Sequence, residues 1–207
     1  MYKQMDYIAA TPDHRLALRF ILLTMIRKGE LVKATWSEVD FEHAVWTIPK
    51  ERMKARKAHN VYLSRQAVDI LTALKACAGA SDYILPARNN PDGHISLGSL
   101  NRTAQAIAKQ AQSQKLPLGD FTLHDLRRTG STLLNEVGFN GDWIEKSLAH
   151  EYSQSSRAVY NKAEYAQQRR HMLQEWGNMI DAWVTGQTYT PALVPPAVEM
   201  KVMEAAV

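Results

Sequence analysis

Only two short stretches of this sequence favour β-strands, and helical patterns fill most of the remainder. The first is residues 45–48, where valine, tryptophan, threonine and isoleucine follow one another, and the second is residues 61–63. β-branched and aromatic side chains favour extended backbone, so these two segments are expected to pair. The sequence therefore predicts a mainly α fold with one small antiparallel β-sheet, which is an α+β class.

Cap residues and glycines mark where the first helices should begin and end. Thr11 is a good cap residue, and Pro12 follows it at the first helical position, where a missing N–H does no harm. This helix should carry Arg27 at its end and stop at Gly29. A short second helix is expected to follow over residues 30–32.

The same signals recur further along the chain. Ser64 and Thr122 are expected to cap helices that stop at Gly79 and Gly138. Residues 80–98 have the turn-rich composition of a loop. Helices are also expected over residues 99–111, 141–150 and about 153–183. Together these segments predict one domain over residues 1–183, followed by a tail over residues 184–207. The tail holds three prolines, so we expect it to be flexible or to pack on a neighbouring protomer.

Positive charge is concentrated in a few places rather than large overall. The formal net charge is only +4, which favours nucleic acid weakly. Residues 50–59, however, carry five lysines and arginines and lie between the two expected strands, so they should form the connection of a β-hairpin. Two further basic pairs are Arg127 with Arg128 and Arg169 with Arg170. Taken singly, such groups are usually solvated surfaces.

Several classes of protein are disfavoured by composition. No apolar run approaches the roughly 20 residues of a membrane span, and the N-terminus has no secretion signal. The one cysteine, Cys77, allows no internal disulfide, indicates a reducing compartment such as the cytoplasm, and is expected to be buried in a helix. The seven histidines form no zinc-binding pattern and the carboxylates do not group, so no metal and no cofactor are expected.

The strongest local pattern is His124 followed by Arg127. Residues three apart share a side of a helix, while Leu126, Leu133 and Val137 fall on the other side and can be buried. Arginine suits a phosphate because its planar fork donates two parallel hydrogen bonds and keeps its charge. The pair could equally be an ordinary surface contact, and the pattern alone does not decide between these readings.

Five motifs, taken in order, resemble the boxes of tyrosine recombinases, and most of all those of phage and genomic-island integrases. They are TMIRKGEL at 24–31, the MK of ERMKARKAHNVYLS, LHDLRRTGSTL at 123–133, LAH at 148–150 and AVYNKAEY at 158–165. The resemblance covers about residues 11–183. It implies a tyrosine recombinase catalytic-domain fold and an enzyme that cleaves and rejoins DNA through a covalent 3′-phosphotyrosine, without ATP or metal.

The resemblance also implies which residues carry the reaction. The matching positions are Arg27, Lys54, His124, Arg127, His150 and Tyr160. One departure is Ala149, which stands where the family usually has glycine, and it bears on the local helix geometry rather than on the histidine. Contacts to DNA are expected from the neighbouring basic residues, namely Lys50, Arg52, Arg56, Lys57, His59 and Arg128.

Phosphodiester cleavage explains these residue types. The resemblance makes Tyr160 the nucleophile, and because the phenol has a reference pKa of about 10, a base must help to ionise it. His124 is the implied base. Arg27 and Arg127 would stabilise charge on the nonbridging oxygens, where His150 adds a hydrogen bond. The hairpin lysine would protonate the departing 5′ oxygen.

Some assignments stay open at this point. Tyr152 and Tyr165 are rival nucleophiles, and Lys50 and Lys57 are rivals for the hairpin lysine. His59 could contact a phosphate or stabilise the hairpin, and Glu30 is expected to support Arg27 or a helix end.

The expected partner is double-stranded DNA, with a tetramer on paired sites in a complete protein that has N-terminal modules before this domain. The sequence leaves a type IB topoisomerase and a DNA-binding fragment without catalysis as alternatives, and a metal-dependent nuclease is disfavoured.

Overall fold

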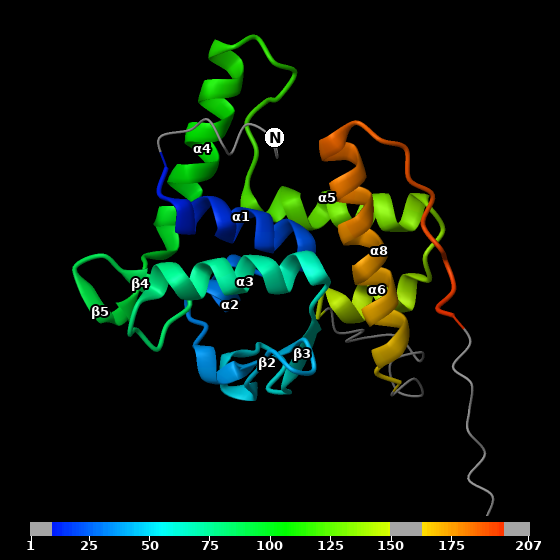
Figure 1. Cartoon of the computed structure of the whole chain (residues 1–207), viewed down its shortest axis with the longest axis horizontal. Helices are drawn as coiled ribbons and strands as arrows, with labels where there is room; N and C mark the ends of the chain where they lie inside the picture. Colours follow the sequence, from blue (N-terminus) through cyan, green and yellow to red (C-terminus); the bar gives the residue numbers. More distant parts are fainter. Residues whose placement is uncertain (1–9, 150–162, 197–207) are drawn as a thin grey trace, which may run out of the picture.

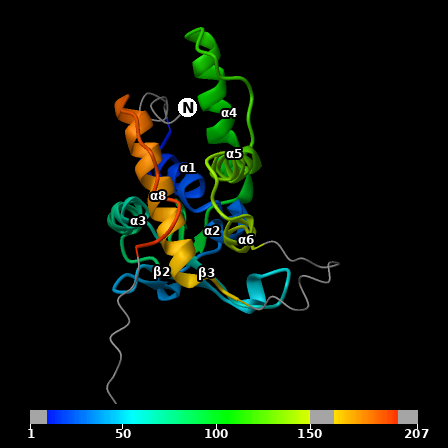
Figure 2. The ribbon, with the colours of Figure 1, turned by 90° about the vertical axis from the view of Figure 1, so that its right-hand side faces the viewer.

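The fold is built around one buried helix. A computed structural model of the chain describes residues 10–149 and 163–196. Helix α1 (Pro12–Thr24) lies between α3 (Arg65–Ala78) and α5 (Leu123–Glu136), and it also contacts α4 (Leu97–Ser113) and α8 (Ala166–Thr185) (Figures 1 and 2). Seven of its residues are buried, all of them between Ala17 and Thr24. Helix α4 projects beyond this body in both views.

The end of α1 differs from the sequence-based expectation. The helix stops at Thr24, and Met25 adopts the left-handed conformation with φ 55° and ψ 24°. The chain then enters α2 (Lys28–Val32), with Arg27 as its N-cap residue. Gly29 therefore lies inside the second helix, and the prediction that it ends the first helix was wrong. A buried methionine provides the left-handed turn for which a glycine was expected.

Two small antiparallel sheets are present in the described residues. The first has the order β1 (Val39–Asp40), β2 (Val45–Ile48) and β3 (His59–Tyr62), with Ile48 opposite His59. It confirms the predicted hairpin and leaves the basic residues in the connection, which includes a 3₁₀ turn at Lys50–Arg52. The second sheet pairs β4 (Pro86–Ala87) with β5 (Asn90–His94), inside the segment that was predicted to be a loop. Its turn-forming residues gave no strand signal.

The predicted helix caps are largely confirmed. The Ser64 side chain accepts a hydrogen bond from Ala67 N at the start of α3, and Gly79 follows that helix with φ 62°. Thr122 caps α5, and Gly138 takes φ 100° after its end. A 3₁₀ turn at Trp36–Glu38 and helix α6 (Gly141–Ser147) complete the described elements. The prediction for Cys77 was wrong, because it is exposed in the last turn of α3. No helix in residues 10–149 or 163–196 is long and apolar enough to cross a membrane.

Helix α8 and the segment after it fold back on each other. The Trp176 indole of α8 donates to the carbonyl of Leu22, 2.9 Å away, and so fixes α8 to α1. After Gly186 the chain returns along α8, where Glu175 accepts bonds from the Tyr189 hydroxyl at 2.9 Å and from Ala192 N at 2.8 Å (Figure 1). The described part of the tail thus packs on its own chain. Packing of the tail on a neighbouring protomer stays a prediction.

Candidate active site

Arg127 is the buried centre of the candidate site. It lies on α5, whose start is held by a capping box in which Thr122 and Asp125 bond to each other's backbone N–H groups. The guanidinium donates to the carbonyl of Met25 and, at 3.0 Å, to the carbonyl of Leu148. Gly130, one turn further along, allows this approach, because an added Cβ would lie 2.8 Å from the Met25 sulfur. Arg127 therefore holds the ends of α1 and α6 together.

Burial makes this arginine unusual electrostatically. Arg127 is only 4% exposed, although the sequence-based reading presented it to an open cleft. The pKa of Arg127 is lowered to about 10, mainly by desolvation and also by the nearby charge of Arg27, while Glu30 opposes the shift. The group still carries its proton at neutral pH. It can therefore act as a fixed positive charge with little water around it. Such a charge stabilises negative charge that develops in a transition state.

Arg27 supplies a second, more accessible guanidinium. It is the N-cap residue of α2, and its Nη1 lies 2.9 Å from Glu30 Oε1, while Glu30 Oε2 accepts its backbone N–H at 2.8 Å. Glu30 thus supports both Arg27 and the helix start, as predicted. A longer bond of 3.5 Å reaches the carbonyl of Ala149. The Arg27 side chain is 44% exposed, so it can still meet a ligand.

Left-handed residues shape the backbone on both sides of these arginines. Met25 accepts the bond from Arg127, and Ala149, with φ 50°, accepts the bond from Arg27. Non-glycine residues adopt this conformation at a cost of about 1–2 kcal/mol, and such strain clusters at functional sites. The conformation of Ala149 gives a physical reason for the glycine that the resemblance leads one to expect there. The alanine adopts the left-handed conformation that a glycine would adopt without this cost.

His124, Arg27 and Arg127 meet at one cavity of about 390 Å³. His124 is exposed at the start of α5, on the same side as Arg127, as the spacing predicts. The cavity lies between α2, α4 and α5, and it is also lined by Lys28 of α2 and by Asn101, Ala104 and Gln105 of α4. The Lys28 ammonium donates to Asn101 Oδ1 at 3.0 Å. The sequence analysis did not name Lys28 or Asn101 as site residues, because the contact between α2 and α4 that brings them together is a tertiary one.

The basic hairpin connection is mostly open to solvent. It projects below α6 in Figure 2, and the side chains of Lys50, Lys54, Arg56 and Lys57 are exposed. Arg52 is different, because it donates to the carbonyl of Glu30 at 3.0 Å and pairs with Glu38. Its guanidinium supports α2 from within the protein, which is not the placement expected of a DNA contact.

Arg128, by contrast, is exposed, and its only described ion pair is a loose one of 3.9 Å to Asp125. Its side chain is therefore open to solvent, and its contact with DNA stays a prediction. Two of the six implied catalytic residues, His150 and Tyr160, lie outside the described residues.

His59 is partly buried near Arg27, Arg127 and Arg169, and it is not among the residues that line the cavity. Burial lowers its pKa to about 3, and the positive charges of Arg169, Arg27 and Arg127 add to this effect, while a hydrogen bond to the Ser147 backbone opposes it. The imidazole is therefore neutral at physiological pH. A neutral ring held against α6 fits the hairpin-stabilising alternative better than a charged contact to phosphate.

This depressed pKa predicts an acid-sensitive fold. Between pH 7 and pH 5 the unfolded chain binds a proton on His59 that the folded chain refuses, so stability falls as pH falls through this window. With reference and folded pKa values of 6.5 and about 3, the loss is about 2 kcal/mol. Urea unfolding at both pH values should show an acid-induced loss about 2 kcal/mol smaller in His59→Gln than in the unchanged chain. Equal losses in the two proteins would mean that His59 titrates normally.

Comparisons with known proteins bear on this arrangement. The model of the phage integrase family matches residues 1–167. The chain belongs to the phage integrase family. Among curated relatives, prophage integrase IntA of Escherichia coli K12 is 38% identical over 165 residues, which are 80% of this chain and 38% of IntA. Prophage integrase IntZ of the same strain is 36% identical over 186 residues, 89% of this chain and 44% of IntZ. This integrase-family chain thus spans less than half the length of these relatives.

Solved structures agree on the fold of this integrase-family chain. The integrase from mycobacterium phage Brujita superposes with a TM-score of 0.62 at 16% identity, covering 83% of this chain and 54% of that protein. A lambda integrase dimer bound to a COC′ core site gives a TM-score of 0.54 at 18% identity, covering 80% and 46%. The predicted recombinase catalytic-domain fold, mainly helical with small antiparallel sheets, is therefore confirmed.

Proposed function

We propose that this chain is the catalytic domain of a site-specific DNA recombinase that cleaves and rejoins strands through a 3′-phosphotyrosine formed by Tyr160. Its reaction would integrate or excise a phage or genomic island. The observation that carries the proposal is the meeting of Arg27, Arg127 and His124 at one cavity. Two guanidinium groups and an imidazole in such a place are what a phosphodiester needs when charge grows on its oxygens.

The remaining steps follow from the residues implied by the family. The Tyr160 oxygen attacks the phosphorus as the bond to the 5′ oxygen breaks, so the phosphodiester energy is kept in a new tyrosine ester. His124 would accept the phenol proton, and Lys54 would give a proton to the departing oxygen. Attack by another 5′ hydroxyl on the tyrosine ester reverses the sequence and joins the new strand. Recombination needs paired cleavages, which is why we propose a tetramer on two DNA sites.

One assay separates this proposal from its alternatives. The chain is incubated, in parallel reactions with and without EDTA, with supercoiled DNA and with linear DNA that carries a relative's attachment site. A covalent protein–DNA adduct on the attachment site, followed by joining to a second site, is the expected result. Relaxation of any supercoiled plasmid would instead favour a type IB topoisomerase. Binding without an adduct would favour a DNA-binding fragment, and EDTA-sensitive cleavage a metal-dependent nuclease.

DNA binding should depend strongly on salt. The exposed hairpin lysines and arginines would release counterions on meeting phosphates, so affinity should fall about 10³-fold between 50 and 200 mM salt if about six phosphates are contacted. Fluorescence anisotropy on a short duplex measures this slope. Changing Lys50 and Lys57 together to Gln should reduce the slope by about 2.

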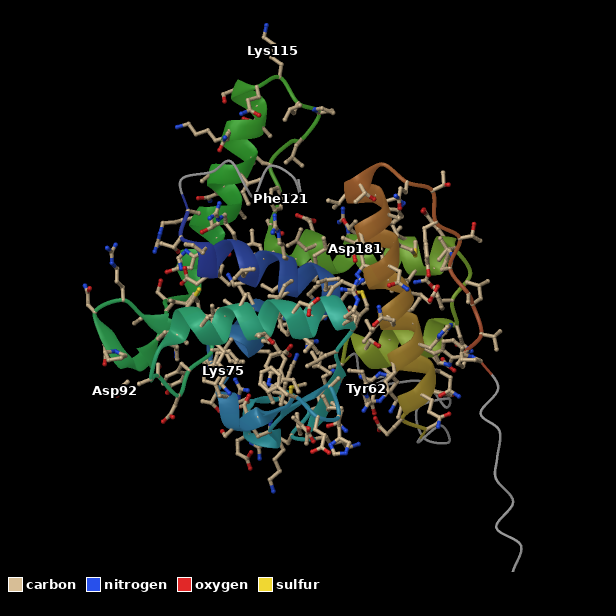
Figure 3. The ribbon with its side chains drawn as sticks, in the orientation of Figure 1. Tyr62, Lys75, Asp92, Lys115, Phe121 and Asp181 are labelled. Carbon is tan, nitrogen blue, oxygen red and sulfur yellow. The ribbon has the colours of Figure 1, made fainter. Side chains whose placement is uncertain are left out.

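Lys75→Gln is the matched control for this experiment. Lys75 lies on α3 (Figure 3), outside the hairpin connection, and its ammonium lies over the rings of Trp36 and Phe41, so the slope should not change. A flat salt response of the unchanged chain would mean that phosphates are not the main contacts.

A further inference from the structure

A second buried arginine lies outside the set that the motifs implied. Arg169, in the first turn of α8, is 1% exposed, although its sequence context with Arg170 reads as a basic surface pair. Burial lowers the pKa of its guanidinium, and the ring of Tyr62 and the carboxylate of Glu164 oppose this. Arginine keeps its proton in such surroundings, so a full positive charge is enclosed here.

Its hydrogen bonds reach three separate parts of the chain. Nη2 donates to the carbonyl of Asn60 at 2.6 Å, Nε to the Ser147 hydroxyl at 3.3 Å, and Nη1 to the carbonyl of Glu164 at 3.4 Å. The guanidinium also lies 4.9 Å from the ring centroid of Tyr62, which Figure 3 labels beside the start of α8. Each of the three guanidinium nitrogens of Arg169 thus donates a hydrogen bond.

Each of these three parts adjoins a residue of the proposed reaction. Asn60 follows His59 at the end of the hairpin connection that carries Lys54. Ser147 closes α6, three residues before His150, and Glu164 comes four residues after Tyr160. We propose that Arg169 is a positioning residue for strand cleavage, which holds the hairpin, the end of α6 and the segment after Tyr160 in one arrangement. This inference rests on the recombinase function proposed above.

Net stabilisation alone is a poor explanation for this charge. Among residues 10–149 and 163–196, the carboxylate paired with it is that of Glu164 at 3.7 Å, which is 68% exposed, so this part of the chain offers no buried anion to offset the desolvation of the guanidinium. Uncharged side chains of similar size often fill such a space with equal or better stability. Arginine has another effect. Its donors have a fixed planar arrangement, so the groups that accept their hydrogen bonds are held in a defined position relative to one another.

The neighbouring Arg170 offers a matched control. Its guanidinium lies 4.6 Å from the centroid of the same Tyr62 ring and donates to the carbonyl of His43 at 2.8 Å. His43 lies in the turn between β1 and β2, and none of the three segments named above is bonded to Arg170 in the contacts described. Loss of Arg170 therefore removes similar packing and the same charge, but not the proposed positioning.

The test compares Arg169→Gln, Arg169→Lys and Arg170→Gln in the complete chain. Single-turnover cleavage is followed on DNA nicked beside the scissile phosphate, and DNA affinity is measured separately. We expect both Arg169 variants to cleave about 10–100-fold more slowly, as small misplacements of reacting groups do, with affinity within about threefold. Arg169→Lys keeps the charge without the fork, so it should not recover the rate. Arg170→Gln should stay within about threefold in both measurements.

A second readout does not depend on catalysis. Amide exchange over residues 59–62 and 144–149 should accelerate in both Arg169 variants and not in Arg170→Gln, and an NMR titration should show the His59 pKa rising in Arg169→Gln, where the repelling charge is gone. Unchanged exchange and cleavage in the Arg169 variants overturn the proposal. So do equal losses of affinity and rate, or an equal loss in Arg170→Gln.

The two proposals can fail separately. If the unchanged chain forms no adduct at all, the recombinase function and the cleavage role of Arg169 fall together. The exchange measurement would then still report whether Arg169 joins the three segments. If the unchanged chain forms the adduct and the Arg169 variants match it, only the present inference is wrong.

Discussion

Tyr160→Phe is expected to abolish covalent attachment of the chain to DNA while DNA binding persists. The change removes one hydroxyl and keeps the ring, so folding should be unaffected, and no other group is proposed to attack the phosphorus. The substrate is a duplex nicked beside the scissile phosphate, from which the short 5′-hydroxyl fragment escapes, so that the adduct accumulates. Denaturing gels that resolve protein from protein–DNA adduct give the yield of adduct. The unchanged chain should give a visible adduct band, and Tyr160→Phe should give none.

The matched controls are the two neighbouring tyrosines. Tyr152→Phe and Tyr165→Phe should still form adduct at the rate of the unchanged chain. Tyr165 is the N-cap residue of α8 with φ 49°, so its backbone has a structural role at the start of that helix. If Tyr160→Phe still becomes linked through a 3′-phosphotyrosine, the nucleophile is Tyr152 or Tyr165.

Arg27→Ala is expected to slow cleavage about 10²–10³-fold, which is the usual loss for one preorganised donor to a developing oxyanion. The Arg27 side chain is nearly half exposed, but its partner Glu30 is buried, so loss of this ion pair should lower the free energy of unfolding by about 1–3 kcal/mol. DNA affinity should change only a few-fold, because the bond is strongest in the transition state. Rapid-quench cleavage, anisotropy and urea unfolding measure the three quantities.

Lys28→Ala is the control for Arg27. It removes a positive charge from the wall of the same cavity, next to Arg27 in the chain, but not the planar fork. Its cleavage rate should stay within about threefold of the unchanged chain. Equal effects of Arg27→Ala on affinity and on rate would reassign Arg27 to docking.

Arg127→Ala would be a less direct test of the same idea. Its guanidinium satisfies the carbonyls of Met25 and Leu148 inside the protein, and each acceptor left unpaired costs about 1–3 kcal/mol. A slow variant could therefore be a misfolded one. The half-exposed Arg27 separates chemistry from folding more cleanly.

Local chemistry explains which parts of the fold could be predicted. Ser64 and Thr122 were recognised as helix caps because their side chains satisfy backbone N–H groups within three residues, which needs no tertiary contact. The β2–β3 hairpin followed from β-branched residues on both sides of a polar connection. The second sheet, with Pro91 and Gly93 in a strand, was missed because its pairing is not a local preference.

The sequence by itself determined the family of this protein, its helices and the types of residue at its candidate site, because motif order, helix caps and apolar spacing are properties of neighbours along the chain. Only the tertiary structure decided where each guanidinium group points. Arg27 stays accessible, and Arg127 lines the same cavity while it bonds to internal carbonyls. Arg52 and Arg169, in contrast, each bind a carboxylate or carbonyl that lies 14 or more residues away. A guanidinium binds an internal carbonyl as readily as a phosphate, so its role depends on which partner the folded chain brings within reach.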